Sequence, residues 1–217
     1  MPSPDAVVDL LGVLAYGELS AFDRLADDAR MAPDLAGRAE MSAMAAVEFG
    51  HYRLLADRLV ALGADPAAAM DPFTAALETY HSLTEPSTWL EGVVKAYVGD
   101  GIAADFYREV AAFVDAADRD TADLIRDVLA EGERAAFAVR EVKAAVAERP
   151  AVSGRLALWA RRLVGEAISQ AQHVLADRDS LMLLLVEGSG DLAGVATLIS
   201  RLTDRHEERM TALGLSS

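Results

Sequence analysis

Four carboxylate residues stand in apolar stripes where a bundle helix normally carries hydrophobic side chains. They are Glu18, Glu48, Asp100 and Glu131, and His51 follows Glu48 by one helical turn. The Glu48-x-x-His51 spacing places both side chains on the same face of a helix. Carboxylates buried together repel one another, so the pattern favours a cation among them. Carboxylate and imidazole groups suit iron, with manganese as an alternative, and we predict a metal centre in which these five residues hold two ions.

Each carboxylate has apolar neighbours three or four residues away on either side. The flanking pairs are Leu14 and Phe22, Met44 and Tyr52, Tyr97 and Ala104, and Val128 and Ala135. This spacing is that of one helix face, and each carboxylate falls near the middle of its predicted helix. The interval from Glu18 to Glu48 almost equals that from Asp100 to Glu131, so the second half of the pattern repeats the first.

The repeat fails at its last position, where Arg134 stands in place of a second histidine. Arginine stays protonated and offers no lone pair to a metal ion, so occupancy of a second metal position is in question. Arg134 can instead pair with Glu131, one turn away. Glu166 or His173, on a polar row of a later helix, could supply the absent ligand if that row faces the bundle; an exposed face is the alternative interpretation.

Other acidic and histidine residues make weaker candidates. Asp105 could replace Asp100, and an arginine of a neighbouring helix could neutralise Glu18 without any metal. The glycines on either side of Asp100 can also mark a kink in its helix. His81 falls in a connection between helices, and His206 stands among charged residues on an expected polar face.

Long antiparallel helices are needed to bring these residues together, and the sequence carries the signals for them. Aromatic residues make up only 6% of the chain, and no segment alternates apolar and polar residues as a strand does. Turn residues separate the expected helices, which cover residues 4–30, 33–62, 87–116, 118–148, 153–186 and 190–213. A long connection, residues 63–86 with a short helix near 72–80, separates the first pair from the second.

Two helical hairpins joined by one long crossover define a ferritin-like four-helix bundle. We therefore predict an all-α fold in a single domain, residues 1–217, with core hairpins at 4–62 and 87–148 and two additional C-terminal helices over 153–213. Residues 181–186 are apolar on every side, which indicates either complete burial or a subunit contact. We expect a homodimer.

Composition excludes several classes of function. The chain has 35 acidic and 20 basic residues, a net charge of −15, and this acidity disfavours a nucleic-acid partner. Cysteine is absent, which excludes thiolate ligands, disulfides and thiol nucleophiles. No apolar run approaches the roughly 18 residues of a membrane span, and the N-terminal residues lack a basic signal region, so we predict a cytoplasmic protein without membrane contact.

Four short motifs resemble those of a known family of ferritin-like proteins. They are Ala15-Tyr16-Gly17-Glu18, Glu48-Phe49-Gly50-His51, Tyr97-Val98-Gly99-Asp100-Gly101 and Arg161-Arg162-Leu163-Val164-Gly165-Glu166. The resemblance is to bacterial proteins grouped with the tRNA 2-methylthio-isopentenyladenosine hydroxylase, in particular their short actinobacterial branch. It implies a non-haem di-iron centre that activates oxygen, with Glu18, Glu48, His51, Asp100 and Glu131 as ligands. The net charge opposes the tRNA substrate of the family.

Three functions are compatible with these observations. The first is a di-iron oxidoreductase or hydroxylase, which requires an external electron donor because the sequence has no motif for a redox cofactor. The second is a ferritin-like bundle with a degenerate one-metal or empty site that acts as a dimeric interaction module. The third, metal storage or peroxide removal, is less favoured because a small dimer lacks the hollow shell that storage requires.

Overall fold

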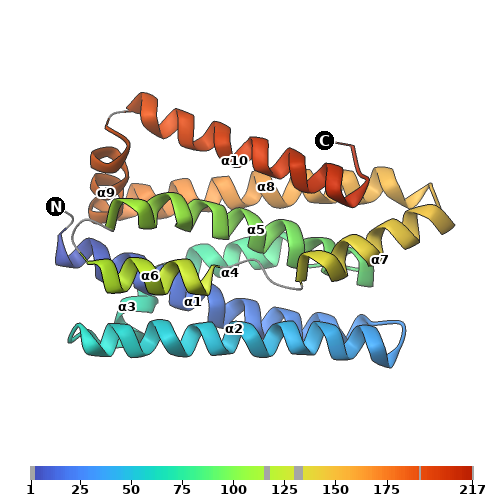
Figure 1. Ribbon diagram of the computed structural model, residues 1–217, viewed down its shortest axis with the longest axis horizontal. Helices are drawn as coiled ribbons and strands as arrows, with labels where there is room; N and C mark the ends of the chain where they lie inside the picture. The colour runs from blue at the N-terminus through green and yellow to red at the C-terminus, as the bar shows by residue number, and fades with distance from the viewer. Residues whose placement is uncertain (1–2, 115–117, 130–133, 191, 217) are drawn as a thin grey trace.

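The computed structural model describes residues 3–114, 118–129, 134–190 and 192–216, and the described part is helical without strands (Figure 1). The α-helices are α1 Pro4–Asp28, α2 Leu35–Ala61, α3 Pro66–Met70, α4 Thr74–Leu83, α5 Trp89–Val114, α6 Arg119–Val128, α7 Arg134–Glu148, α8 Val152–Asp177, α9 Asp179–Ser189 and α10 Leu192–Leu213. Short 3₁₀ turns at Ala29–Met31 and Asp71–Phe73 follow α1 and α3. The predicted all-α, ferritin-like bundle with one long crossover is confirmed.

The first hairpin has well-defined helix ends. The hydroxyl of Ser3 accepts a hydrogen bond from the amide of Ala6, 3.1 Å away, and so caps α1. At the start of α2 the Asp34 carboxylate accepts from the amide of Gly37 at 2.8 Å. Caps satisfy amides that the first helical turn leaves without partners. The two long helices of this antiparallel hairpin therefore begin at defined positions.

Apolar side chains from α1, α2 and the crossover fill one half of the interior. Fully buried members of this cluster are Leu10, Leu11, Leu14, Leu55, Leu59 and Phe73. A second cluster joins the other end of α2 to α5, α8 and α10 through Met41, Val93, Leu156, Leu163 and Met210. The site residues of α1 and α2 lie between these two clusters along the helices, and Asp100 of α5 lies within the second.

The expected helix 118–148 is wrong, because the structure has two helices there, α6 and α7. Leu129 ends α6 in a turn, and its carbonyl oxygen accepts a hydrogen bond from the Arg108 guanidinium of α5. Residues 130–133 lie outside the described part of the chain.

The expected helix 153–186 is also two helices, α8 and α9. Arg178 separates them with non-helical backbone angles, φ −131° and ψ 89°. Its guanidinium lies over the ring of Phe73 at 5.4 Å, a cation–π contact that favours this departure from the helix. As Figure 1 shows, α9 then lies across one end of the molecule and leads into α10.

The apolar run 181–186 forms part of α9 and is mostly buried within the chain. Leu181, Leu184 and Leu185 belong to the first core cluster, whereas Leu183 is 58% exposed. The expectation of burial is therefore largely correct, and this segment gives little support to a subunit contact. Among the described helices, none is long and apolar enough to cross a membrane.

Two glycines of the first hairpin lead to opposite expectations for alanine substitution. A Cβ atom at Gly12 of α1 would fall well inside contact distance of the backbone carbonyl of Ala69, so Gly12→Ala must displace α3. We expect a loss of about 1–3 kcal/mol in the free energy of unfolding, measured by denaturant titration. A Cβ atom at Gly50 of α2 would instead fall in open space. Gly50→Ala should therefore raise the free energy of unfolding by about 0.5–1 kcal/mol. Equal effects of the two substitutions would contradict this account of the α1–α3 contact.

Candidate metal centre

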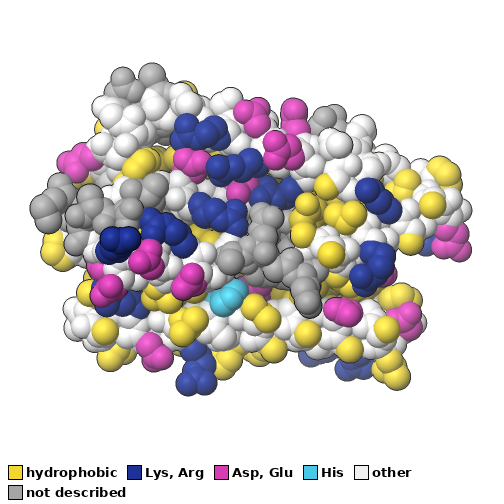
Figure 2. Space-filling model, viewed as in Figure 1, with side chains coloured by type: hydrophobic (Ala, Val, Ile, Leu, Met, Phe, Trp, Pro, Cys, Tyr) yellow, Lys and Arg dark blue, Asp and Glu magenta, His cyan; other side chains and the backbone are white. Residues whose placement is uncertain are grey.

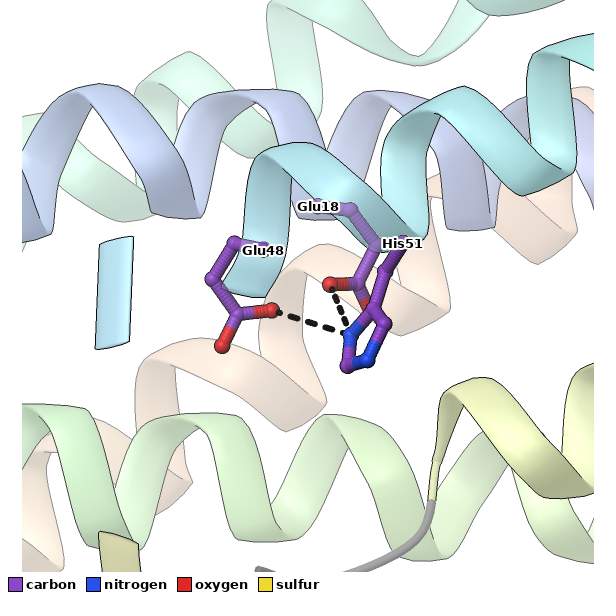
Figure 3. Close-up of side chains that lie close together, drawn as sticks. All are labelled: Glu18, Glu48 and His51. Atoms are coloured by element: carbon purple, nitrogen blue, oxygen red, sulfur yellow. Dashed lines mark hydrogen bonds and ion pairs between the residues drawn. The ribbon is translucent and has the colours of Figure 1, made fainter. Parts of the chain in front are cut away.

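Glu18, Glu48 and His51 converge on one point between α1 and α2 (Figure 3). The Nδ1 atom of His51 lies 3.3 Å from Oε2 of Glu18 and 3.6 Å from Oε2 of Glu48. One ligand atom from each residue falls within 4.8 Å of the others, so a single ion placed among them could contact all three. Both carboxylates point toward the imidazole in Figure 3, from two different helices.

These side chains are sheltered from solvent. The side chain of Glu48 is 3% exposed, that of Glu18 13% and that of His51 17%. The apolar stripes predicted around them account for the burial, since Leu14 and Met44, one turn before each carboxylate, are buried in the core. Helical spacing therefore turns both acids inward, as the sequence predicts.

Asp100 of α5 faces the same region from the opposite side of the bundle. Burial, and then the nearby charge of Glu18, raise the pKa of the Asp100 carboxyl to about 8. The Lys95 ammonium, on the same helix, acts in the opposite direction but does not overcome these effects. An acid with this pKa is in a position where a bound cation would favour its ionised form.

Helix α5 runs without interruption from Trp89 to Val114 through the glycines beside Asp100. These glycines make room for side chains of other helices. A Cβ atom at Gly99 would lie 2.7 Å from the hydroxyl of Tyr80, and one at Gly101 would collide with the guanidinium of Arg209. Both glycines thus allow α4 and α10 to pack closely over the backbone that carries Asp100.

A cavity of about 230 Å³, partly open to solvent, lies against the carboxylates. Glu18, Glu48 and Asp100 all line it, together with the tyrosines Tyr80, Tyr97 and Tyr107. Burial, followed by the charge of Glu18, raises the pKa of Tyr107, and this phenol stays protonated at neutral pH. Most of the remaining lining is aliphatic, so the acidic groups border a space that is poor in water.

Asp105, the alternative to Asp100, belongs to a separate ionic cluster. Its carboxylate is 2% exposed and lies 2.9 Å from Arg108, 2.6 Å from Arg209 and 3.6 Å from Arg205. Basic side chains gather here where α10 crosses α5 (Figure 2). Three guanidiniums neutralise Asp105 and link α5 to α10, so this residue is not available to a metal in the cavity.

Three further candidates occupy other positions. His173 is exposed, which excludes it as a ligand in the bundle interior, whereas Glu166 is half-buried and near enough to Tyr80 to raise the pKa of its phenol. His206, expected on an exposed face, is buried: α10 turns it inward, and burial lowers its pKa. Glu131 lies outside the described residues, as does the side chain of Arg134, so the fifth predicted ligand stays a prediction.

A buried polar group next to Asp100 escaped the sequence analysis. Lys95 is 6% exposed, and its ammonium donates a hydrogen bond to the carbonyl oxygen of Thr84 at 2.8 Å. Burial lowers the pKa of Lys95 to about 8 and raises that of Asp28, a neighbouring carboxyl, to about 6. The signal was present, because Lys95 interrupts an apolar run from Val93 to Val98.

His81 lines the cavity, and its position in the sequence alone did not reveal this. Its Nε2 atom lies 3.1 Å from the hydroxyl of Ser20 on α1. Burial and the charges of Lys95 and Arg24 lower its pKa to about 3, so the ring is neutral. The crossover helix α4 thus contributes a neutral imidazole to the cavity that Glu18 also lines.

A family model described as a ferritin-like domain of actinomycetes matches residues 3–188. The match covers most of the chain, and the protein therefore belongs to this ferritin-like family. No curated protein sequence matches the chain. Membership agrees with the helical bundle and with acids at its centre, but a fold by itself does not define an activity.

The raised pKa of Asp100 predicts how stability of the metal-free protein depends on pH. The pKa of this acid is 3.8 in its ordinary state and about 8 in the folded protein. As the pH rises between these values the unfolded state loses its proton first, so the free energy of unfolding falls. At pH 9, Asp100→Asn should therefore increase the free energy of unfolding by more than about 1 kcal/mol, and the gain should vanish near pH 4.

Urea titrations in the presence of a chelator measure this difference. Asp57→Asn, at an exposed site of α2, is the matched control and should show no comparable gain at pH 9. If Asp100→Asn raised the free energy of unfolding equally at both pH values, burial would not disfavour ionisation of the Asp100 carboxyl.

Proposed function

We propose that this ferritin-like protein is a non-haem di-metal oxidoreductase that uses two iron ions, or manganese, held by Glu18, Glu48, His51, Asp100 and Glu131. The convergence of Glu18, Glu48 and His51 within 4.8 Å carries the proposal. The family supports it, as does the position of Asp100 on the same cavity. Glu131 enters on the evidence of the sequence alone.

The donor set fits iron or manganese better than other common metals. Two carboxylates and an imidazole are hard and borderline ligands, and the protein contains no cysteine thiolate for softer metals. Buried acids beside one another also gain most from a di- or trivalent cation, because its charge offsets both desolvation and mutual repulsion. Bound iron would supply the reduction of dioxygen and the oxidation of an unreactive C–H bond.

The residues of the chain orient the metal ligands and exclude water from the cavity. Glu18 and Glu48 hold the imidazole of His51 between them, which fixes its ring orientation. The aliphatic cavity wall excludes water from the reacting bond, and the neutral phenol of Tyr107 can donate a hydrogen bond at the cavity surface. An external electron donor completes the proposal, because the sequence has no motif for a redox cofactor.

The resemblance to the tRNA 2-methylthio-isopentenyladenosine hydroxylase group supports hydroxylation as the class of reaction. It does not extend to the nucleic acid, because a net charge of −15 disfavours binding to a polyanion. A homodimer and a cytoplasmic location complete the proposal and rest on the sequence alone.

One observation favours the alternative, a degenerate site in a dimeric interaction module. The Nδ1 atom of His51 lies 3.3 Å from Glu18 and 3.6 Å from Glu48, so the imidazole links both carboxylates without any metal. In that case the ferritin-like bundle would serve as a scaffold with one metal or none. Metal content separates the two proposals directly.

We expect protein produced with iron to contain close to two iron ions per chain, measured by elemental analysis. Glu48→Ala and His51→Leu each remove a ligand, so both should lose most of the metal and its iron-dependent absorbance, while circular dichroism shows intact helices. Glu40→Ala changes an exposed carboxylate on the same helix and should leave the metal content unchanged. Full metal in the His51→Leu protein, or none in the wild type, would exclude the proposed centre.

Removal of metal should also lower thermal stability. Without a cation the carboxylates repel one another, and at a hundredfold excess of free metal over Kd the bound state gains about 2.7 kcal/mol. For a chain of this size the loss corresponds to a fall in Tm of about 5 °C or more, measured by calorimetry with and without chelator. The Glu48→Ala protein should show no such response, and an unchanged wild-type Tm would point to the interaction module.

A further inference from the structure

We infer that the cavity binds an elongated, uncharged, apolar ligand, a hydrocarbon chain, with one end at the carboxylate cluster. As the substrate class of the enzyme, this inference rests on the proposed function. As a binding property, it rests on the cavity alone. The size, direction and lining of the cavity carry it.

The cavity extends along the bundle away from the metal ligands. At its far end it is lined by Leu10 of α1 and Val110 of α5. Leu10 precedes Glu18 by about two turns and Val110 follows Asp100 by nearly three, which amounts to about 12–15 Å along the helices. Helix α9, which contacts both α1 and α5, closes this end with Leu181 and Leu185.

Polar groups are concentrated near the other end. The carboxylates of Glu18, Glu48 and Asp100 line this end, and Tyr97 lies about one turn from Asp100 on α5, whereas Tyr107 lies about two turns from Asp100 in the direction of Val110. Arg209, which also lines the cavity, lies 2.6 Å from the carboxylate of Asp105. A ligand that matches this distribution has a long apolar part and a reactive or weakly polar end, because a charged group would lose its hydration in the aliphatic part.

The volume suits a molecule larger than a single ring. An engineered apolar cavity of about 150 Å³ stays dry and binds benzene, and the cavity here is about 230 Å³. An empty apolar space of this size weakens a fold, since its lining atoms lose contacts. Small residues line the space: Ala96 and Ala104 on α5, and Ala167 and Ala171 on α8.

Binding of 1-octanol to metal-free protein tests the inference without dependence on the metal. Calorimetric titration should give saturable binding of one octanol per chain, and octanoate, with the same chain and an anionic end, should bind about tenfold more weakly because the carboxylates repel it. Equal or tighter binding of octanoate would overturn the uncharged class, and no binding of octanol would overturn the inference as a whole.

Two cavity-filling substitutions locate the ligand. Val110→Phe and Ala171→Phe place a ring in the cavity from α5 and α8, and each should raise the Kd for octanol by about tenfold or more. Ala176→Phe, at an exposed position of α8, is the matched control and should bind octanol as the wild type does. Melting curves confirm folding, and the two positions on different helices guard against failure of one variant.

Metal analysis of the same proteins separates the two proposals. Octanol binding that the filling variants abolish, in a protein without metal, would leave the ligand site standing and remove the oxidoreductase. If the protein holds two iron ions per chain but binds no octanol, the oxidoreductase proposal stands and the ligand site is excluded. The same conclusion follows if both filling variants still bind octanol. Unchanged metal in Ala171→Phe with lost octanol binding is the result that both proposals expect.

Discussion

The position of ionisable acids inside an apolar bundle is the constraint on which the rest of this structure depends. Glu18 and Glu48 are held at 3.3 and 3.6 Å from one imidazole, and Asp100 lies close enough to sense the charge of Glu18. Such a group of acids is tolerated only where the surrounding helices are rigidly placed and a positive charge can be bound. The capped first hairpin and the long, continuous α5 meet the first requirement.

The chain treats its two kinds of buried acid differently. Asp105 is surrounded by three arginines and joins α5 to α10, which is a structural use of charge. Glu18 and Glu48 instead face a histidine, whose neutral form is a metal ligand. Asp100 and Asp105 are separated by little more than one turn of α5, but their side chains leave the helix on nearly opposite faces. This division explains why only one of them borders the cavity.

Much of the fold and of the site could be predicted because helical periodicity alone determines which side chains face inward. The stripes through Glu18, Glu48 and Asp100 needed no knowledge of the neighbouring helices. The break at Arg178 and the end of α6 at Leu129 could not be predicted, because the groups in contact there, the ring of Phe73 and the guanidinium of Arg108, come from elsewhere in the chain. Such tertiary contacts override local helix propensity.

The space beside the acids bears on the choice between enzyme and scaffold. Alanines on α5 and α8 keep a cavity open where leucines would increase buried area and stability. A scaffold gains nothing from a void or from an acid whose ionisation burial opposes, since a packed apolar residue at Asp100 would serve it better. Both features weaken the fold at the same place, and both are what oxidation of an apolar molecule requires: a dry space and a charged wall for a metal. Their coincidence favours the oxidoreductase over the interaction module.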